Sequence, residues 1–386
     1  MERQRKNPDR VERGTCRVVH LTTVHHPHDP RIFHKQLKTL RDAGYDAQLV
    51  ASHKQSETVD GIPITALSQV KGRYRRIRLQ REVYQEARRL NADVYHIHDP
   101  ELIPVGHILQ RVTGAALIYD MHEDYWWHGP VEGRLIRLLE RWCFQWVDHV
   151  VVANDHHQDI TRSSAVPATR IANYFKPIGH VPIHAAHSCF SDEEPLRLIY
   201  TGVISDQGGR GLSSLIRLAE LVHREAFNAK LKLVGICYVD RIRRQAAGRI
   251  ERNGLRETLQ RVGWDRYVSW EEMVPHLQRA HVGLVLGTPH PNQAEKIPTK
   301  FYEYLHFGLP ILCSDFPRWR QFVEQHECGA VVPAGDPNAA LNVLRRWRND
   351  PDRYHTLARA ARAAAPLYRW ESMQPRLIRV YDELTA

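Results

Sequence analysis

The chain has 386 residues, of which 42% are hydrophobic and 25% charged, and its formal net charge is +10. This length favours two domains over one compact core, and the composition excludes a disordered chain. No apolar run approaches the roughly 18 residues of a membrane-spanning helix, and the polar start MERQRKNPDRVERGT resembles no signal peptide. The six cysteines lack C-x-x-C spacing, which predicts free thiols, including buried Cys237 and Cys313, and a reducing cytoplasm.

The positive charge predicts an anionic partner, which could be a nucleic acid, a nucleotide or a membrane surface. The sequence has no zinc-finger spacing, no aromatic RNA-binding segment and no basic helix fused to heptads. We therefore expect no nucleic-acid partner and favour the other two.

Short β-branched runs alternate with helical patterns through the first half of the chain. The predicted strands are CRVVHL (16–21), DAQLVA (46–51), DVYHI (93–97), ALIY (116–119) and HVVVA (149–153). Helical periodicity covers RIFHKQLKTLRDAG and the Arg-rich stretch 73–90. This alternation is typical of an α/β domain with a parallel, doubly wound sheet.

The pattern stops at residues 174–195, which hold four prolines and show no period. A second series follows, and its predicted strands are LRLIY (196–200), LKLVGI (231–236), HVGLVL (281–286), LPILCS (309–314) and GAVVP (329–333). We therefore predict a first Rossmann-like domain over 1–174, a linker over 175–195 and a second such domain over 196–367. A cleft between them is the expected binding site.

The stretch EKIPTKFYE (295–303) combines two glutamates with a predicted helix start. Pro298 and Thr299 signal the start, with Thr299 as N-cap, and Gly308 signals the stop. The first helical turn offers N–H groups and a positive dipole end to a diphosphate, and Lys300 adds a charge. Glu295 and Glu303 can accept hydrogen bonds from sugar and ribose hydroxyls, although a solvated helix start would show the same spacing.

With its continuation YLHFGLPIL, this stretch resembles the E-x₇-E segment of retaining glycosyltransferase family 4, whose members have the two-domain GT-B fold. LIYTGVISDQGGRG (198–211) is similar to the first strand and loop of that family's donor domain. There the resemblance assigns donor contacts to Gly202, Gly209 and Arg210, and to Thr299, Lys300 and Glu303 in the later helix. The first of the family's two basic loop positions is Val203 here, so Arg210 is the main diphosphate ligand.

The first half resembles a polysaccharide-building branch of the family, beginning with HLTTVHHPHDPRIFHKQL. The resemblance places His122 near the reacting face of the donor sugar, with Glu295 as the other catalytic candidate. Candidate contacts to acceptor or phosphate are the polar loop residues Asp29, Arg31, His98, Asp99 and Glu123. In the GT-B fold, a terminal helix such as the one predicted over 368–386 crosses back to the N-terminal domain.

The resemblance implies transfer of a sugar from a nucleotide-diphosphate donor to an acceptor hydroxyl with retention, in cell-surface glycan assembly. Arginine, lysine and a helix N-terminus can stabilise the leaving diphosphate, so neither metal nor cofactor is expected.

Three other readings of the sequence stay open. H-x-H-D (96–99) and HHPHD (25–29) have metal-ligand spacing, which would suit a metal-dependent hydrolase. The same fold could also serve a non-catalytic nucleotide-sugar-binding protein, or phosphorylase or epimerase chemistry.

The acceptor is predicted from two basic segments. Residues 125–147 combine tryptophans and arginines on a predicted helix, and 71–89 extend the basic surface. A core-packed helix would also show this pattern. The functional reading is peripheral binding to the anionic inner face of the cytoplasmic membrane, with a glycan or lipid-linked acceptor.

Overall fold

The computed structural model describes residues 15–69, 75–121, 138, 140–162, 164–178, 193–290, 293 and 296–386. The chain divides into two compact units. Unit 1 comprises Met1–Asn173 and Trp370–Ala386, and unit 2 comprises Tyr174–Arg369. The chain therefore crosses from one unit to the other twice.

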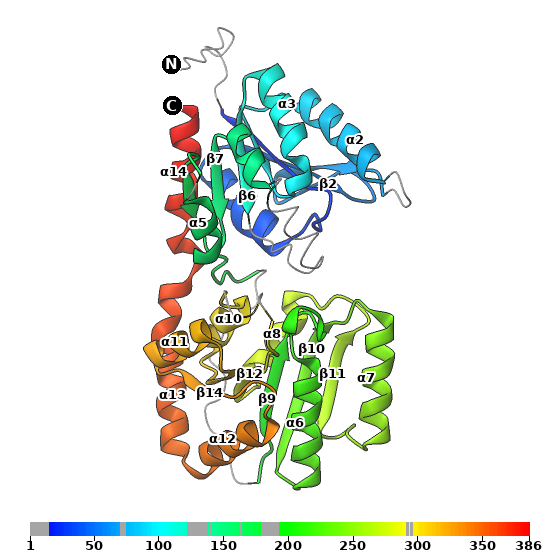
Figure 1. Cartoon of the computed structure of the whole chain (residues 1–386), viewed down its shortest axis with the longest axis vertical. Helices are drawn as coiled ribbons and strands as arrows, with labels where there is room; N and C mark the ends of the chain where they lie inside the picture. The colour runs from blue at the N-terminus through cyan, green and yellow to red at the C-terminus, as the bar shows by residue number, and fades with distance from the viewer. Residues whose placement is uncertain are drawn as a thin grey trace. The chain divides into compact units, whose positions relative to one another are not determined.

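Unit 1 contains an eight-stranded sheet in the order β3-β4-β2-β1-β5-β6-β7-β8, in which only the β3–β4 pair is antiparallel (Figure 1). Its strands are β1 (Arg17–Leu21), β2 (Asp46–Ser52), β3 (Glu57–Val59), β4 (Ile62–Leu67), β5 (Val94–Ile97), β6 (Ala116–Met121), β7 (His149–Val152) and β8 (Ala168–Arg170). The helical segments described in unit 1 are η2 (Pro30–Leu37), α1 (Lys38–Asp42), α2 (Arg75–Leu90), η3 (Pro100–Leu102), α3 (Ile103–Thr113), η5 (Phe144–Trp146), α5 (Asp155–Thr161), η8 (Trp370–Ser372) and α14 (Gln374–Thr385).

Strand alternation gives the two faces of this sheet different chemistry. Val19 and Leu21 of β1 belong to an apolar core that also includes buried side chains of α2 and α3. His20, between them, points to the other face and contacts Tyr381 of α14. One face therefore carries this apolar core, and the other combines buried apolar side chains such as Val18 and Phe33 with polar contacts of His20.

Unit 2 contains an all-parallel sheet in the order β11-β10-β9-β12-β13-β14. Its strands are β9 (Leu196–Thr201), β10 (Ala229–Ile236), β11 (Leu259–Trp264), β12 (Val282–Val285), β13 (Ile311–Ser314) and β14 (Gly329–Val332). The helical segments described here are η6 (Gln207–Gly209), α6 (Leu212–Arg224), α7 (Asp240–Arg252), α8 (Trp270–Gln278), α10 (Thr299–Phe307), α11 (Pro317–His326), α12 (Pro337–Asn349), α13 (Pro351–Ala364) and η7 (Ala365–Tyr368). Leucines and valines of β9, β10 and β12 pack with α6 and α12 in one core. The two helices lie next to each other in Figure 1.

The predicted α/β class with two doubly wound sheets is confirmed, and each predicted strand is present within a few residues of its expected bounds. Cys237 and Cys313 are buried and free, as predicted. The N-cap assignment was wrong, because Pro298 is the N-cap and Thr299 is the first helical residue. Four strands were not predicted: β3, β4, β8 and β11.

The first helix of unit 1 also differs from the prediction, because its first eight residues, η2, are π-helical. Asp29 precedes it and caps it by accepting hydrogen bonds from the N–H groups of Arg31 and Ile32. A π-helix repeats its contacts at a spacing of five residues. Arg31 and Gln36, five residues apart, both reach the same carboxylate on β6.

The C-terminal segment packs entirely on unit 1. The Trp370 indole is fully buried and donates to Thr39 Oγ1 at 2.9 Å. Further along, the Tyr381 hydroxyl lies 3.0 Å from His20 Nε2 and also contacts His96 Nδ1. A hydroxyl can donate to one of these nitrogens and accept from the other, so it serves one nitrogen of each imidazole.

We expect Tyr381→Phe to lower the free energy of unfolding by about 1–3 kcal/mol, because it leaves buried imidazole nitrogens without that partner. Amide hydrogen exchange should accelerate in α14 and leave α6 and α12 of unit 2 unchanged. Tyr238→Phe, at a side chain that is 69% exposed, is the control. Equal effects of the two variants would contradict the role given to the buried hydroxyl.

Candidate functional site

The two sheets share a topological feature that locates their binding edges. Strand order reverses on either side of β1, which lies between β2 and β5, and of β9, which lies between β10 and β12. In doubly wound sheets, ligands bind outside the carboxyl ends of the strands at such a switch point. The loops after β1, β5, β9 and β12 are therefore the candidate site segments.

In unit 2, the end of β9 lies against the first turns of α10. Thr201 Oγ1 donates to Glu303 Oε2 at 3.1 Å. Lys300 Nζ lies 3.8 Å from the centre of the Tyr200 ring, a cation–π contact. It also lies next to Gly202, whose φ of 104° is readily adopted only by glycine. The structure thus brings the predicted residues Gly202, Lys300 and Glu303 together.

Tyr304 fixes α10 against the sheet. Its fully buried hydroxyl accepts from the Thr201 N–H at 3.2 Å and lies 3.3 Å from the carbonyl oxygens of Ile199 and Leu284. Burial raises the pKa of this hydroxyl, so it stays protonated. The contacts join β9, β12 and α10, and they hold Glu303, the preceding residue, at the edge of the sheet.

The glycine-rich loop after β9 packs against the loop after β12. The Thr288 N–H donates to the Gly209 carbonyl, and Gln293 Nε2 donates to the Gly208 carbonyl at 2.6 Å. Arg210 Nη1 donates to the Gln207 carbonyl at 2.9 Å. Burial, followed by the positive charges of Arg210 and then Lys296, lowers the pKa of His290. Two cations therefore lie near this histidine.

In unit 1, three histidines and Tyr381 form a buried network. His20 and His96 are register partners on β1 and β5. His20 Nδ1 lies 2.9 Å from His98 Nε2, and the rings of His96 and His98 stack with 4.7 Å between centroids. Burial, and then the neighbouring His96, lower the pKa of His20 well below its ordinary value, so its ring is neutral at pH 7.

Asp120 is the buried carboxylate beside this network. Arg31 donates to both of its oxygens, at 2.9 and 2.8 Å, and Gln36 Nε2 donates at 2.6 Å. Arg31 also donates to the Ile171 carbonyl. His98 Nδ1 lies 3.6 Å from the same carboxylate.

Asp99, after β5, anchors the loop after β1. Its carboxylate accepts from the Thr22 hydroxyl and from both the N–H and the hydroxyl of Thr23. His25 Nε2 lies 3.6 Å from Asp99 Oδ1, whereas both Thr23 groups donate to Oδ2. With Asp29 at the N-terminus of η2, both ends of this loop are held by carboxylates.

Two groups among the described residues have metal-ligand geometry. One is His20, His96 and His98, and the other is His28 in the loop after β1 with His53 and Glu57 in the segment that leads from β2 into β3. The first group is buried and the second is partly exposed.

The predicted acceptor contacts have mainly structural partners. Arg31, His98 and Asp99 are each at most 3% exposed and bonded within unit 1. A direct contact of these residues or of Asp29 with an acceptor stays a prediction. The predicted His122, Glu123 and Glu295 lie outside the described residues.

Tyr304 and Tyr381 were not predicted as site residues, although both position the site. Each lies in a helix at a spacing that sequence patterns assign to the core, and no pattern shows that a buried hydroxyl will find a polar partner.

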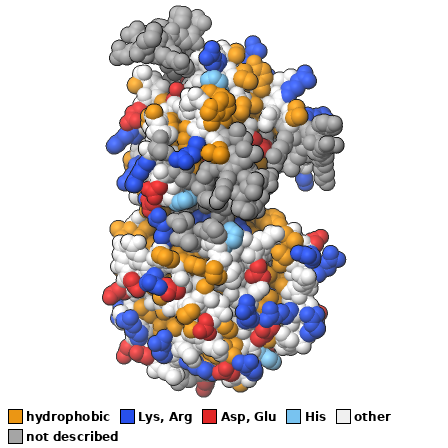
Figure 2. Space-filling model, viewed as in Figure 1, with side chains coloured by type: hydrophobic (Ala, Val, Ile, Leu, Met, Phe, Trp, Pro, Cys, Tyr) orange, Lys and Arg blue, Asp and Glu red, His pale blue; other side chains and the backbone are white. Residues whose placement is uncertain are grey.

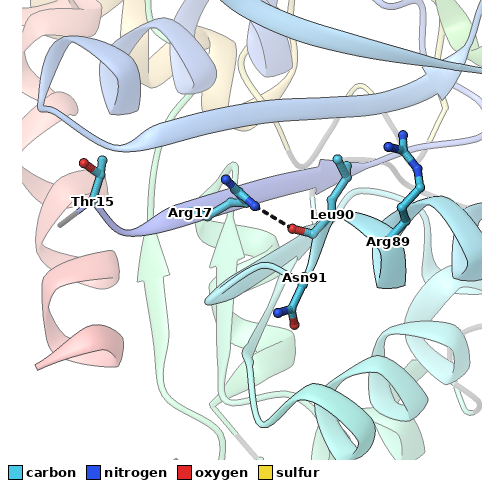
Figure 3. A pocket seen from close by; sticks show the side chains of 5 residues that line it. All are labelled: Thr15, Arg17, Arg89, Leu90 and Asn91. Atoms are coloured by element: carbon cyan, nitrogen blue, oxygen red, sulfur yellow. Dashed lines mark hydrogen bonds between the residues drawn. The ribbon is translucent and has the colours of Figure 1, made fainter. Parts of the chain in front are cut away.

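A pocket of about 390 Å³, lined by Thr15, Arg17, Arg89, Leu90 and Asn91, lies elsewhere in unit 1 (Figure 3). It is at the start of β1 and just ahead of β5, which is the amino edge of the sheet. Arg17 donates to the Leu90 carbonyl at 2.9 Å (Figure 3). It also donates to Asp46 at 2.6 Å, so its charge is already paired. Because ligands of doubly wound sheets bind at the opposite edge, this pocket is not the candidate site.

Gly209 and Gly335 form a matched pair for testing the glycine-rich loop, with φ of 73° and 79°. Alanine at either position has the same left-handed strain, about 1–2 kcal/mol. A Cβ at Gly209 would lie 2.6 Å from His290 Cβ and 2.7 Å from the Thr288 carbonyl, whereas a Cβ at Gly335 meets nothing within 4 Å. We expect Gly209→Ala to destabilise unit 2 more than Gly335→Ala in denaturant unfolding. Equal losses would show that the loops do not pack this closely.

Two families match the chain in succession. Residues 30–173 match the Glycosyl transferase 4-like domain, and residues 188–364 match Glycosyl transferases group 1. Phosphatidyl-myo-inositol mannosyltransferase of Mycobacterium leprae is 22% identical over 313 residues, which cover 76% of this chain and 74% of that protein.

Solved structures share the fold over nearly the whole chain. Sucrose-phosphate synthase from Thermosynechococcus elongatus has a TM-score of 0.77 at 17% identity, covering 96% of this chain and 99% of that one. The Anabaena protein HepE, in complex with UDP-glucose, has a TM-score of 0.72 at 14% identity, covering 95% and 99%.

The hydrolase reading is not favoured, since ligands around one barrel would be needed and the described strands form two open sheets. The two family matches, the sheet topology and the shared fold agree: the chain belongs to the family 4 type of glycosyltransferases and has the GT-B fold.

Proposed function

We propose that this glycosyltransferase transfers a hexose from a nucleotide-diphosphate sugar to an acceptor hydroxyl, with retention of the anomeric configuration, in cell-surface glycan assembly. Unit 2 holds the donor. HepE has been solved with UDP-glucose, which makes UDP-sugars the first donors to test.

One observation carries the proposal. At the carboxyl edge of the unit 2 sheet, the first turns of α10 lie against the end of β9, where Thr201 bonds Glu303 and Lys300 lies beside Gly202. A helix N-terminus and a lysine suit a diphosphate, and a carboxylate suits ribose hydroxyls. Both requirements of a nucleotide diphosphate are thus met within one helical turn.

Arg210 is the second cation of the proposed donor site. Its backbone follows Gly209, whose close packing against Thr288 fixes the loop at the sheet edge. The side chain is partly exposed, and its hydrogen bond to the Gln207 carbonyl engages one guanidinium nitrogen, Nη1. Developing negative charge on the leaving diphosphate would be stabilised by Arg210, Lys300 and the α10 dipole together, in a mechanism that requires no metal or other cofactor.

A donor screen tests the proposed function. Purified protein is incubated with UDP-, GDP- and ADP-sugars and a lipid extract, and released nucleoside diphosphate is measured. Turnover of one donor supports transfer, and the anomeric proton coupling of the product distinguishes retention from inversion. Nucleoside diphosphate binding without turnover of any donor would instead favour the non-catalytic binding protein.

Glu303→Ala should weaken nucleoside diphosphate binding by about 1.5–3 kcal/mol, because a charge-assisted hydrogen bond to the ribose is lost. Calorimetric titration measures the change. Glu324→Ala, at an exposed position on α11 of the same unit, should leave the affinity unchanged. An unaltered affinity in Glu303→Ala would remove the ribose role.

We further propose an acceptor at the inner face of the cytoplasmic membrane, carried on a lipid. The mannosyltransferase relative is named for phosphatidyl-myo-inositol, a lipid. Among the described residues, no helix is long and apolar enough to cross a bilayer, so attachment would be peripheral.

An exposed apolar group in unit 1 supports this proposal. Ile108 and Val112, one turn apart on α3, are 50% and 52% exposed, and Trp142 is 58% exposed. Trp142 packs on Trp146, which stacks on His107 of α3, so these side chains are neighbours. Hydrophobic side chains gather over α3 in Figure 2, next to Lys and Arg side chains. Apolar insertion beside basic charge is what binds an anionic bilayer surface.

Vesicle co-sedimentation should show binding to phosphatidylglycerol-containing vesicles but not to neutral ones, weakening as salt rises. The double variant Ile108→Ser, Val112→Ser should partition at least about tenfold less, because the loss of even two buried CH₂ groups, at roughly 0.8 kcal/mol each, exceeds a factor of ten. Leu367→Ser, at a side chain 62% exposed in unit 2, is the control. Absence of binding to either vesicle would overturn the membrane proposal and leave the donor proposal standing.

A further inference from the structure

The histidine-rich loop after β1 takes no part in the proposed donor site, yet one of its histidines meets two potential metal ligands from another part of the sheet. We propose that His28, His53 and Glu57 bind a divalent transition-metal ion of the Zn²⁺ class. His28 lies in the HHPHD segment, His53 directly follows β2, and Glu57 is the first residue of β3.

The three ligand atoms already converge. His28 Nε2 and His53 Nε2 lie 2.9 and 3.0 Å from the same oxygen, Glu57 Oε1, and all three atoms are within 4.8 Å of one another. Ligand atoms of tetrahedral zinc, with bonds of about 2.0–2.2 Å, are separated by roughly 3.3–3.5 Å. Opening the two contacts by about 0.4 Å would therefore admit the ion between them. Two imidazoles and one carboxylate form a zinc donor set that leaves a fourth position for water.

The buried group of His20, His96 and His98 is a weaker candidate, and the difference is geometric. The stacked rings of His96 and His98 are inclined by only 14°, so their lone pairs lie in two nearly parallel planes rather than in planes that cross at one ion. Nitrogens of His20 and His96 are bonded to Tyr381. The rings of His28 and His53 are instead inclined by 48° and point their Nε2 atoms at one spot.

Accessibility also separates the two groups. The side chains of His28, His53 and Glu57 are 38%, 19% and 31% exposed, so an ion can enter from solvent. His20 and His96 are fully buried.

The proposed ligands stand on fixed backbone. The His28 ring stacks on Phe33 of η2, with 5.5 Å between centroids. Glu57 pairs with Ile64 in the β3–β4 ladder, and the His53 N–H donates to the Leu67 carbonyl. Little ordering is therefore needed on binding. The ion would tie the loop after β1 to the segment that connects β2 with β3.

Calorimetric titration of ZnCl₂ into EDTA-treated, dialysed full-length protein tests the proposal. We expect one tight site in the wild type. His53→Gln and Glu57→Gln should each weaken it at least about tenfold, since even altered outer-shell partners cost that much. His355→Gln on α13 removes a histidine of unit 2 and should leave the affinity unchanged. X-ray absorption of the zinc-loaded protein should show imidazole and carboxylate ligands at about 2.0–2.2 Å.

The ligand substitutions are at partly exposed positions, and circular dichroism verifies that the variants fold. Equal zinc affinity in wild type, His53→Gln and Glu57→Gln would overturn the proposal, as would an equal loss in His355→Gln. Zinc binding is read directly, so the result does not depend on donor turnover.

Discussion

One buried carboxylate, Asp120, organises the carboxyl edge of the first sheet. It is fully buried, and the hydrogen bonds from Arg31 and Gln36 compensate its loss of hydration. Removing one partner of such a buried pair typically costs about 3–5 kcal/mol, because the other charge is left uncompensated. Arg31 also bonds the carbonyl of Ile171, so one interaction joins η2, β6 and the segment after β8. The loop that carries Asp29 and the proposed metal ligand His28 ends at η2, which these hydrogen bonds hold in place.

The C-terminal helix α14 is held on unit 1 by polar contacts with the same sheet. An apolar helix face tolerates small shifts along a sheet, whereas two buried imidazoles require a hydroxyl at one position, which Tyr381 supplies. The chain crosses between the units twice, at 173–174 and at 369–370. Inside unit 2 the two crossing segments pair, since the Phe175 N–H donates to the Tyr368 carbonyl. Any hinge between the units must change the backbone at these few residues.

Apolar strand runs and the E-x₇-E segment made both sheets and α10 predictable from sequence. The β3–β4 hairpin was missed although Asp60-Gly61, with φ of 50° and 75°, is a typical two-residue hairpin turn. That signal was readable. The π-helical start of η2 could not be predicted from local sequence. It depends on Asp120, on a strand distant in the sequence, which accepts hydrogen bonds from both Arg31 and Gln36. The convergence of His28 with Glu57 likewise requires the β3–β4 pairing, which local sequence patterns do not encode.

The contrast between the units bears on how each contributes to transfer. In unit 2, Lys300 is held over the Tyr200 ring and Glu303 by Thr201, so both are ordered before a ligand arrives and lose little freedom on binding. In unit 1, Arg31 and Asp99 are buried and already bonded, so their effect on an acceptor is best explained through the loops they position. The proposed donor residues of unit 2 are thus preorganised, whereas the buried polar residues Arg31 and Asp99 of unit 1 act as scaffold.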